Sequence, residues 1–224
     1  MSFLKNLFGR KKSPKEVIQK EFTPEEYEIH GEQKQEGLEY VLEKMHDSVG
    51  HAIIPFSVGG AVDMYYFPNG IEGTGFATME LINPDGTGPI PNRTGTYELV
   101  AFTRLPLMVS DDERHPFSPI ERRICGIFTT IGFYSFEAKL EPLETAEIPQ
   151  DEEEPNTCLI FDEWKPDGKE FRIGDSKHGL LLVMEVFRDE MEYAMKNGGS
   201  KLIEKLKEKG HYPYSDLNRK SVLE

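Results

Sequence analysis

The chain has 224 residues, of which 38% are hydrophobic and 11% aromatic, which is enough apolar material for the core of one compact domain. Its 26 basic and 40 acidic side chains give a formal net charge of -14, which repels phosphate backbones; we expect no nucleic acid ligand and a basic partner. No apolar run reaches the roughly 20 residues of a membrane-spanning helix, and no secretory segment follows Met1, so we expect a cytoplasmic protein without stable membrane association.

Residues 1–20 are predicted to form a flexible leader ahead of a domain at 21–224. The leader is amphipathic, because four apolar residues share one side of a short potential helix and a basic cluster follows, and it could touch a membrane surface. So few helical turns are marginal in water, so we expect the segment to dock loosely or not at all. The four apolar residues are Phe3, Leu4, Leu7 and Phe8.

Two helices are predicted at the start of the domain. Thr23 and Glu26 have the spacing of a capping box, and Pro24 fits the first helical position. A second helix is predicted from about Gly37, because apolar residues recur there at helical spacing, and it is expected to end at Gly50.

The period then changes to that of β-strands. Short runs rich in β-branched and aromatic residues, separated by turn-forming glycine and proline, predict a β-meander. A long loop at 83–95 leads to a further strand. The predicted strands are 52–58, 61–67, 75–82 and 96–103.

The second half begins with another capping signature, Ser118 to Glu121, ahead of a helix expected to lie across the sheet. An exposed acidic loop is predicted at about 141–156, followed by strands at 157–164 and 179–187, the second apolar on both faces like a central strand. Two helices follow. Strands and helices come in blocks, which predicts an α+β fold with a mixed, mostly antiparallel sheet and helices packed on it.

No motif of catalysis is found. The glycine clusters lack the lysine of a phosphate loop, the six histidines are scattered, and Cys125 and Cys158 lie within apolar segments like core residues. We therefore predict no catalytic residue, no cofactor and no metal ligand. The alternative is a hydrolase whose metal or carboxylate centre is assembled from distant residues, which three or more histidines and carboxylates converging in one cleft would indicate.

Four residues are candidates for contacting a protein partner: Asp63, Tyr65, Glu98 and Trp164. Asp63 and Glu98 alternate with apolar neighbours in predicted strands, so we expect them on an outward face or in a groove, either to hold a basic peptide or toxin or as ordinary solvent-facing residues. Trp164 stands at a strand end, where its ring either anchors a partner or packs over the turn.

Several segments resemble the bacterial members of the suppressor-of-fused domain family. The clearest is a hydrophobic strand, a glutamate-rich helix, a glycine pair, a leucine-bearing helix and a closing Asp-x-x-Arg-x-Ser-Val segment. An early strand and a glutamate-leucine strand agree, and the resemblance spans about 49–222. The segments are 180–187, 189–195, 197–203, 216–222, 62–68 and 97–106.

The resemblance implies a single suppressor-of-fused-like domain with a binding function. The animal relative sequesters transcription factors of the Hedgehog pathway by gripping a short peptide through strand addition, and bacterial relatives are often proposed as immunity proteins that neutralise toxins. This sequence shows no second lobe like that of the animal protein, so Hedgehog signalling is not transferred. We expect a non-enzymatic intracellular protein-binding module, with toxin neutralisation as its specific role and a basic toxin or a peptide strand as its partner.

Overall fold

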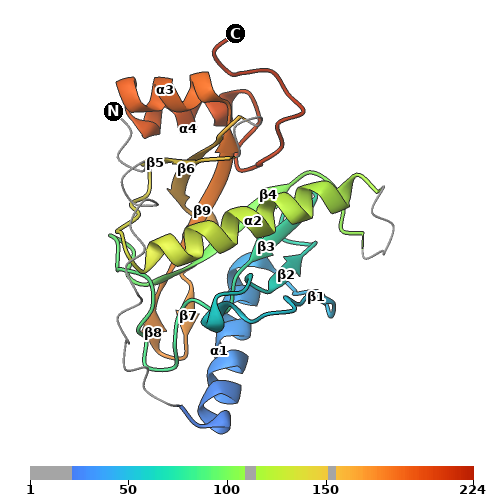
Figure 1. Ribbon diagram of the computed structural model, residues 1–224, viewed down its shortest axis with the longest axis vertical. Coiled ribbons are helices and arrows are strands. Elements are labelled where there is room, and N and C mark those ends of the chain that lie inside the picture. The colour runs from blue at the N-terminus through green and yellow to red at the C-terminus, as the bar shows by residue number, and fades with distance from the viewer. Residues whose placement is uncertain (1–21, 109–114, 151–154) are drawn as a thin grey trace.

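The computed structural model describes residues 22–108, 115–150 and 155–224, drawn in colour in Figure 1. The predicted leader lies outside these ranges. The elements in chain order are α1 (Pro24–Leu42), β1 (Val49–Gly50), η2 (Phe56–Val58), β2 (Met64–Phe67), β3 (Thr74–Ala77), β4 (Tyr97–Thr103), α2 (Phe117–Ser135), β5 (Thr145–Ile148), β6 (Thr157–Glu163), η3 (Pro166–Gly168), β7 (Arg172–Ile173), β8 (Ser176–Lys177), β9 (Gly179–Val186), α3 (Arg188–Asn197) and α4 (Gly199–Glu208).

The main sheet has seven strands in the order β1-β2-β3-β4-β9-β6-β5. Every neighbouring pair is antiparallel except β4 and β9, which run parallel. The predicted α+β class with a mixed, mostly antiparallel sheet is therefore confirmed, as is the central position of β9. Strands β7 and β8 form a separate two-stranded hairpin. The predicted strand at 52–58 is wrong, because that segment contains only the short 3-10 helix η2.

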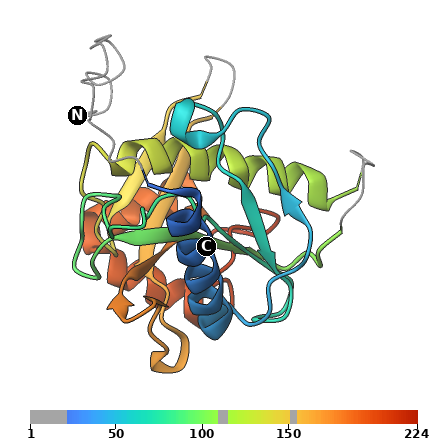
Figure 2. The ribbon, with the colours of Figure 1, turned by 90° about the horizontal axis from the view of Figure 1, so that it is seen from below.

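Helices cover both faces of the sheet, as Figure 2 shows from below. Alternate strand residues enter two separate cores. Val100 and Leu182 belong to the core that includes residues of α1, α3 and α4. Leu99 and Leu181 belong to the core that includes residues of α2. One long helix therefore lies across one face, as predicted, while three helices and the C-terminal segment close the other. None of the helices in the described ranges is long and apolar enough to span a bilayer.

Helix α1 confirms the capping box and corrects the prediction of two helices. The Glu26 backbone N–H donates to Thr23 Oγ1 (3.2 Å), and the Thr23 N–H donates to Glu26 Oε2 (2.7 Å). The helix then continues through Gly37 and ends at Leu42. Gly37 permits a close approach, because a Cβ there would lie 1.9 Å from the Arg172 carbonyl oxygen. Gly37 therefore allows the middle of α1 to pack against the segment at Arg172, and the prediction that a helix begins there is wrong.

The predicted cap of the second long helix is also wrong. Ser118 lies inside α2, whose N-cap residue is Pro116 and makes no side-chain capping bond. The helix instead forms where its apolar stripe packs on the sheet, with Ile124, Phe128 and Ile131 buried.

The acidic segment 141–156 contains a strand where only a loop was predicted. Leu143 has a φ of 75°. Its N–H donates to the Phe161 carbonyl (2.7 Å), and the Phe161 N–H donates to the Glu144 carbonyl (2.9 Å). Leu143 and Glu144 thus lie opposite the single residue Phe161, which is the arrangement of a β-bulge. The bulge sets the register in which β5 pairs with β6.

The C-terminal segment is held to the domain by hydrogen bonds of two of its side chains. Asp216 accepts hydrogen bonds from Thr103 Oγ1 (2.5 Å) and the Arg104 N–H (2.8 Å). Arg219 donates twice to the buried Glu190 carboxylate, at 2.5 and 2.7 Å. Asp216 and Arg219 each bind a different part of the domain, and no bond joins them to each other.

Candidate protein-interaction surface

The four sequence candidates do not meet in one site. Tyr65 lies half-buried in β2 and pairs with Val49 of the edge strand β1. Asp63 precedes β2, where its carboxylate accepts from the Ala52 N–H (2.8 Å) and lies 2.8 Å from His51 Nδ1. Trp164 follows β6, on the other side of the sheet's centre. Burial and the neighbouring Asp63 carboxylate raise the pKa of Tyr65 to about 12, so its hydroxyl stays protonated at neutral pH.

Trp164 packs against aromatic side chains of β4 and of the segment after α4, and not over the turn that follows β6. Its ring centroid lies 4.4 Å from that of Phe102 and 6.3 Å from that of Tyr212. The ring is only partly exposed, and its Nε1 has no hydrogen-bond partner. Packing is therefore its observed contact, and a partner-contacting role remains a prediction.

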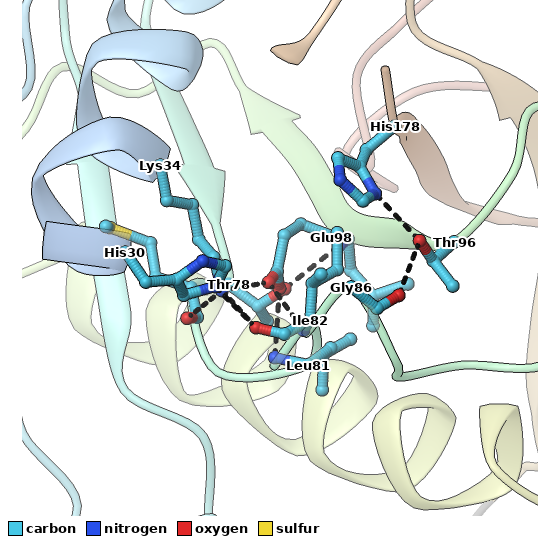
Figure 3. A network of polar contacts seen from close by, with 11 residues as sticks. His30, Lys34, Thr78, Leu81, Ile82, Gly86, Thr96, Glu98 and His178 are labelled. Atoms are coloured by element: carbon cyan, nitrogen blue, oxygen red, sulfur yellow. Dashed lines mark hydrogen bonds and ion pairs between the residues drawn. The ribbon is translucent and has the colours of Figure 1, made fainter. Parts of the chain in front are cut away.

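Glu98 does not face outward. Its side chain is 0% exposed and lies 2.9 Å from Nζ of Lys34, a residue of α1. The expectation that Glu98 faces solvent or lines an outer groove is wrong, because α1 covers the face of β4 on which Glu98 stands. Figure 3 shows the polar network around this pair.

The network leaves no bonding capacity on the ammonium group. Lys34 Nζ donates to Glu98 and to the carbonyl oxygens of Met79 and Ile82, both at 2.7 Å. An ammonium group has three hydrogens, so all of them are used. This lysine therefore has no donor left for a substrate or ligand.

Glu98 is equally well satisfied. Its carboxylate accepts from Thr78 Oγ1 (2.7 Å) and from the backbone N–H groups of Leu81 (3.3 Å) and Ile82 (3.0 Å). Complete hydrogen bonding is what makes a buried ion pair tolerable, because two charges have been removed from water. The network is therefore a structural tie that joins α1 to β4 and to the segment after β3.

The edge strand β5 has an open side. It pairs only with β6, and its Ala146 and Ile148 stand opposite Leu159 and Thr157. Bonded and non-bonded pairs alternate in an antiparallel ladder. Counting from the bonds of the bulge, Ala146 and Ile148 are the residues whose backbone groups point toward β6. Thr145 and Glu147 therefore direct N–H and C=O away from the sheet. No other strand of the described residues pairs with that side.

A groove runs between this strand and α2. It begins as a cavity of about 410 Å³. A second cavity of about 410 Å³ continues it along α2 and shares Thr130, Ile148 and Pro149 with the first. The Phe133 ring in the first part is 41% exposed. The side chains that form the first part are mostly apolar: Ile131, Phe133, Tyr134, Ala146, Ile148 and Pro149.

The charges of the groove differ along its length. Glu137 lies at its apolar end, and Arg122 and Arg123 line the other part. Glu147 of β5 is bonded to Arg188 Nη2 (2.5 Å) and Asn156 Nδ2 (2.5 Å), which lower the pKa of its carboxyl group. Glu147 is therefore ionised and held by Arg188 and Asn156, and it belongs to the lining of the first part of the groove, while its backbone groups face away from β6.

The opposite edge of the sheet is short. Strand β1 has two residues, and just past its end the Ala52 N–H donates to the Asp63 carboxylate of the neighbouring segment before β2. The Asp63 N–H donates in turn to Glu80 Oε2 (2.7 Å). Short strands and charged side chains protect edges from pairing with other chains. An added strand therefore finds a longer ladder at β5, which has four residues, than at β1, which has two.

The sequence did not predict this surface, because β5 was hidden in the acidic segment. The alternation in Thr145-Ala-Glu-Ile148 is a weak strand signal, and Pro142 and Pro149 on either side argued for a loop.

Two histidines and two aspartates do line one pocket, namely His30, His178, Asp85 and Asp175, which is the convergence that the hydrolase alternative requires. In the part of the chain described, however, no group of three or more histidine, cysteine or acidic side chains is arranged to hold a metal ion. Both cysteines are free thiols, as expected from their place in apolar segments.

Comparison with known proteins agrees with this architecture. A solved structure described as "the Sufu-Fu complex crystal structure" is 14% identical in sequence with a TM-score of 0.54, over 88% of this chain and 91% of that chain, which shows a shared fold. No curated protein matches the sequence. The model of the suppressor of fused protein family matches residues 98–220, more than half of the chain. The chain therefore belongs to the suppressor of fused protein family.

Proposed function

We propose that the protein is a non-enzymatic interaction module that binds an extended segment of a protein partner as an additional strand on β5. The observation that carries this proposal is the free edge of β5 beside an apolar groove. Strand addition uses backbone hydrogen bonds for affinity and pockets for alternate side chains for specificity. A protein of similar fold has been solved in a complex described as Sufu-Fu, which supports a role in protein binding.

The groove determines which segments fit. A strand bound to Thr145 and Glu147 would direct every second side chain toward α2, where Phe133, Tyr134 and Ile148 offer apolar contact. Glu137 at the end of the groove favours a basic residue in the partner. The preferred segment therefore has alternating apolar residues and a basic flank.

As its biological role, we propose neutralisation of a basic toxin in the cytoplasm, with the protein acting as an immunity protein. The net charge of -14 favours association with a basic surface, since opposite charges accelerate encounter. Two free cysteines are consistent with a reducing compartment. The expected partner contacts at Asp63, Tyr65 and Trp164 are retained as proposals outside the groove.

The edge mechanism is tested by selecting peptides from a random display library on the full chain. We expect peptides with alternating apolar residues, and we expect them to lose binding to Thr145→Pro, which removes an outward N–H without breaking a bond to β6. Thr145→Val is the matched control, because it changes the same side chain and keeps the N–H. Equal binding to Thr145→Pro, or enrichment of no peptide, contradicts strand addition at β5.

The toxin role needs a separate test. Co-expression with basic toxins encoded beside the gene should restore growth, and Thr145→Pro should abolish the rescue while Thr145→Val preserves it. If no neighbouring gene product is toxic, the immunity role is wrong even where peptide binding succeeds.

A further inference from the structure

A polar pocket of about 480 Å³ lies between α1, the loop after β3 and the β7–β8 hairpin. Its size is within the range of small-ligand sites. Among the described residues that line it, none is a lysine or arginine. The polar side chains of the lining are instead rich in hydrogen-bond acceptors: His30, Gln33, Asp85, Asp175, Ser176 and His178.

His30 presents an acceptor nitrogen. Its Nε2 lies 2.9 Å from the Ile82 carbonyl oxygen, which can only accept, so Nε2 carries the hydrogen. Burial and the nearby Lys34 lower the pKa of His30, so the ring is neutral at pH 7. In a neutral ring with hydrogen on Nε2, Nδ1 has a free lone pair. No described residue hydrogen-bonds to that nitrogen.

His178 presents a second acceptor nitrogen. Its side chain is held at Nδ1 by Thr96 Oγ1 (2.7 Å), and this hydroxyl also lies 3.4 Å from the Gly86 carbonyl oxygen. We assign the hydroxyl hydrogen to that carbonyl, since this arrangement satisfies both groups, and Nδ1 then donates to Thr96. Burial and Lys34 lower the pKa of His178, which keeps the ring neutral, so Nε2 is an acceptor.

The cation nearest to the two rings cannot satisfy these acceptors. In the view of Figure 3, Glu98 lies between His30 and His178, with Lys34 beside it. Lys34 is only 1% exposed, and its three hydrogens are bound elsewhere. Arg172 of the hairpin donates to the Asp175 carbonyl oxygen (2.8 Å) and to Glu170.

We propose that the pocket binds an alkyl guanidinium group, supplied by an arginine side chain of a polypeptide or by a free amine such as agmatine. A guanidinium carries several N–H donors and a charge that is never lost, which suits two imidazole acceptors beside carboxylates. Asp85 and Asp175 supply the negative charge at the pocket mouth, where both residues are exposed. This site is distinct from the β5 groove: Figure 1 places the hairpin and α1 at the opposite end of the molecule from β5.

The test uses the full chain with ¹⁵N-labelled histidine and three probes. These are N-acetyl-arginine methylamide, agmatine, and N-acetyl-citrulline methylamide, which has the same shape as the first probe without its charge. We expect the arginine probe to shift the resonances of His30 Nδ1 and His178 Nε2 and the citrulline probe to bind about tenfold more weakly. Tighter binding of agmatine than of capped arginine identifies a free amine as the ligand, and the reverse identifies a polypeptide side chain.

Two variants distinguish binding of the probe in this pocket from non-specific electrostatic attraction to an acidic protein. His178→Gln should weaken the arginine probe about tenfold. His51→Gln is the matched control, because His51 also lies beside a carboxylate, Asp63, but on the exposed β1 edge. Absence of shifts at His30 and His178 up to about 10 mM probe, ten times the dissociation constant of a weak ligand, overturns the proposal. Equal binding of arginine and citrulline overturns it as well. Both results are independent of peptide binding at β5.

Discussion

Helices cover the two faces of the central sheet to different degrees, and the exposed fractions of the ion-pair side chains on each face show this difference. On the face covered by α1, α3 and α4, the ion pair Lys34–Glu98 has side-chain exposures of 2% and 0%. The pair formed there by Arg219 and Glu190 has 5% and 0%. On the α2 face, the corresponding pair is Arg123–Glu185, in which Glu185 is 2% exposed but Arg123 is 50% exposed.

The difference has a simple geometric cause. A single helix covers the middle of its face and leaves the sheet uncovered on either side, so three of the cavities lie along α2. The side covered by α1, α3 and α4 has cavities too, one beside α1 and one beside Trp164 and Tyr212, but its two ion pairs are buried at both partners. The face covered by three helices contains the fully buried ion pairs, and the α2 face contains the groove at which we propose that a partner binds.

The largest expected effect on stability comes from removing one charge of the buried Lys34–Glu98 ion pair. Lys34→Met leaves the Glu98 carboxylate buried without a counter-charge, which should lower the free energy of unfolding by about 3–5 kcal/mol in urea titration. The control is Lys34→Met combined with Glu98→Gln, which removes the orphaned charge and keeps an acceptor for one of the two N–H groups of Leu81 and Ile82, because these donate to different oxygens of the carboxylate. It should recover part of the loss, and a double variant no more stable than Lys34→Met would refute this view of the network.

The next largest effect on stability is expected where α1 packs closely at Gly37. Gly37→Ala should destabilise the protein by about 1–3 kcal/mol, since the new methyl group meets the Arg172 carbonyl and overpacking outweighs the gain in helix propensity. Gly31→Ala in the same helix is the control, because no atom lies within 4 Å of its Cβ position. It should stabilise by about 0.5–1 kcal/mol, and thermal unfolding of both variants measures the contrast. Equal effects of the two substitutions would contradict a close contact at Gly37.

The contribution of the Arg123–Glu185 ion pair on the α2 face to protein stability should depend on pH. Burial raises the pKa of Glu185 above its usual value, although Arg123 opposes the shift. A carboxyl group whose pKa is higher in the folded state stabilises the fold at low pH and loses this contribution as pH rises through the folded pKa. Arg123→Met should therefore cost about 1–2 kcal/mol near pH 7 and much less near pH 4.5, where protonated Glu185 no longer needs a cation.

Urea titrations at both pH values check this expectation. The exposed ion pair of Arg188 with Glu147 is the control, and Arg188→Met should change stability less at pH 7, since its guanidinium remains in water. A loss from Arg123→Met that is the same at both pH values would show that packing of the arginine, and not its charge, stabilises the α2 face.

The smallest effect on stability is expected in the groove itself. Phe133 is 41% exposed and stacks on Phe56 with ring centroids 4.2 Å apart. Phe133→Ala should cost only about 1 kcal/mol in thermal unfolding. Its effect on binding of a selected peptide should be larger than its effect on stability. A stability loss as large as that of Lys34→Met would mean that the groove belongs to the core.

Much of the fold was readable from local sequence patterns. The apolar run of β9 predicted a central strand, because both its faces are buried, and the capping box of Thr23 predicted the start of α1. The period of two in β4 correctly placed Glu98 on the face opposite to Tyr97 and Leu99. These features depend on neighbouring residues only, so sequence determines them.

The candidate surfaces could not be read in the same way, since they are made by segments far apart in the chain. Whether the face of Glu98 meets solvent depends on where α1 lies, 64 residues earlier in the sequence. The edge of β5 is open because no other strand of the described residues pairs beside it, and the bulge at Leu143 decides which of its backbone groups face outward. The sequence by itself determined the elements and the alternation of their faces, while the tertiary structure decided which faces and edges are covered, because burial is a property of the contacts between elements.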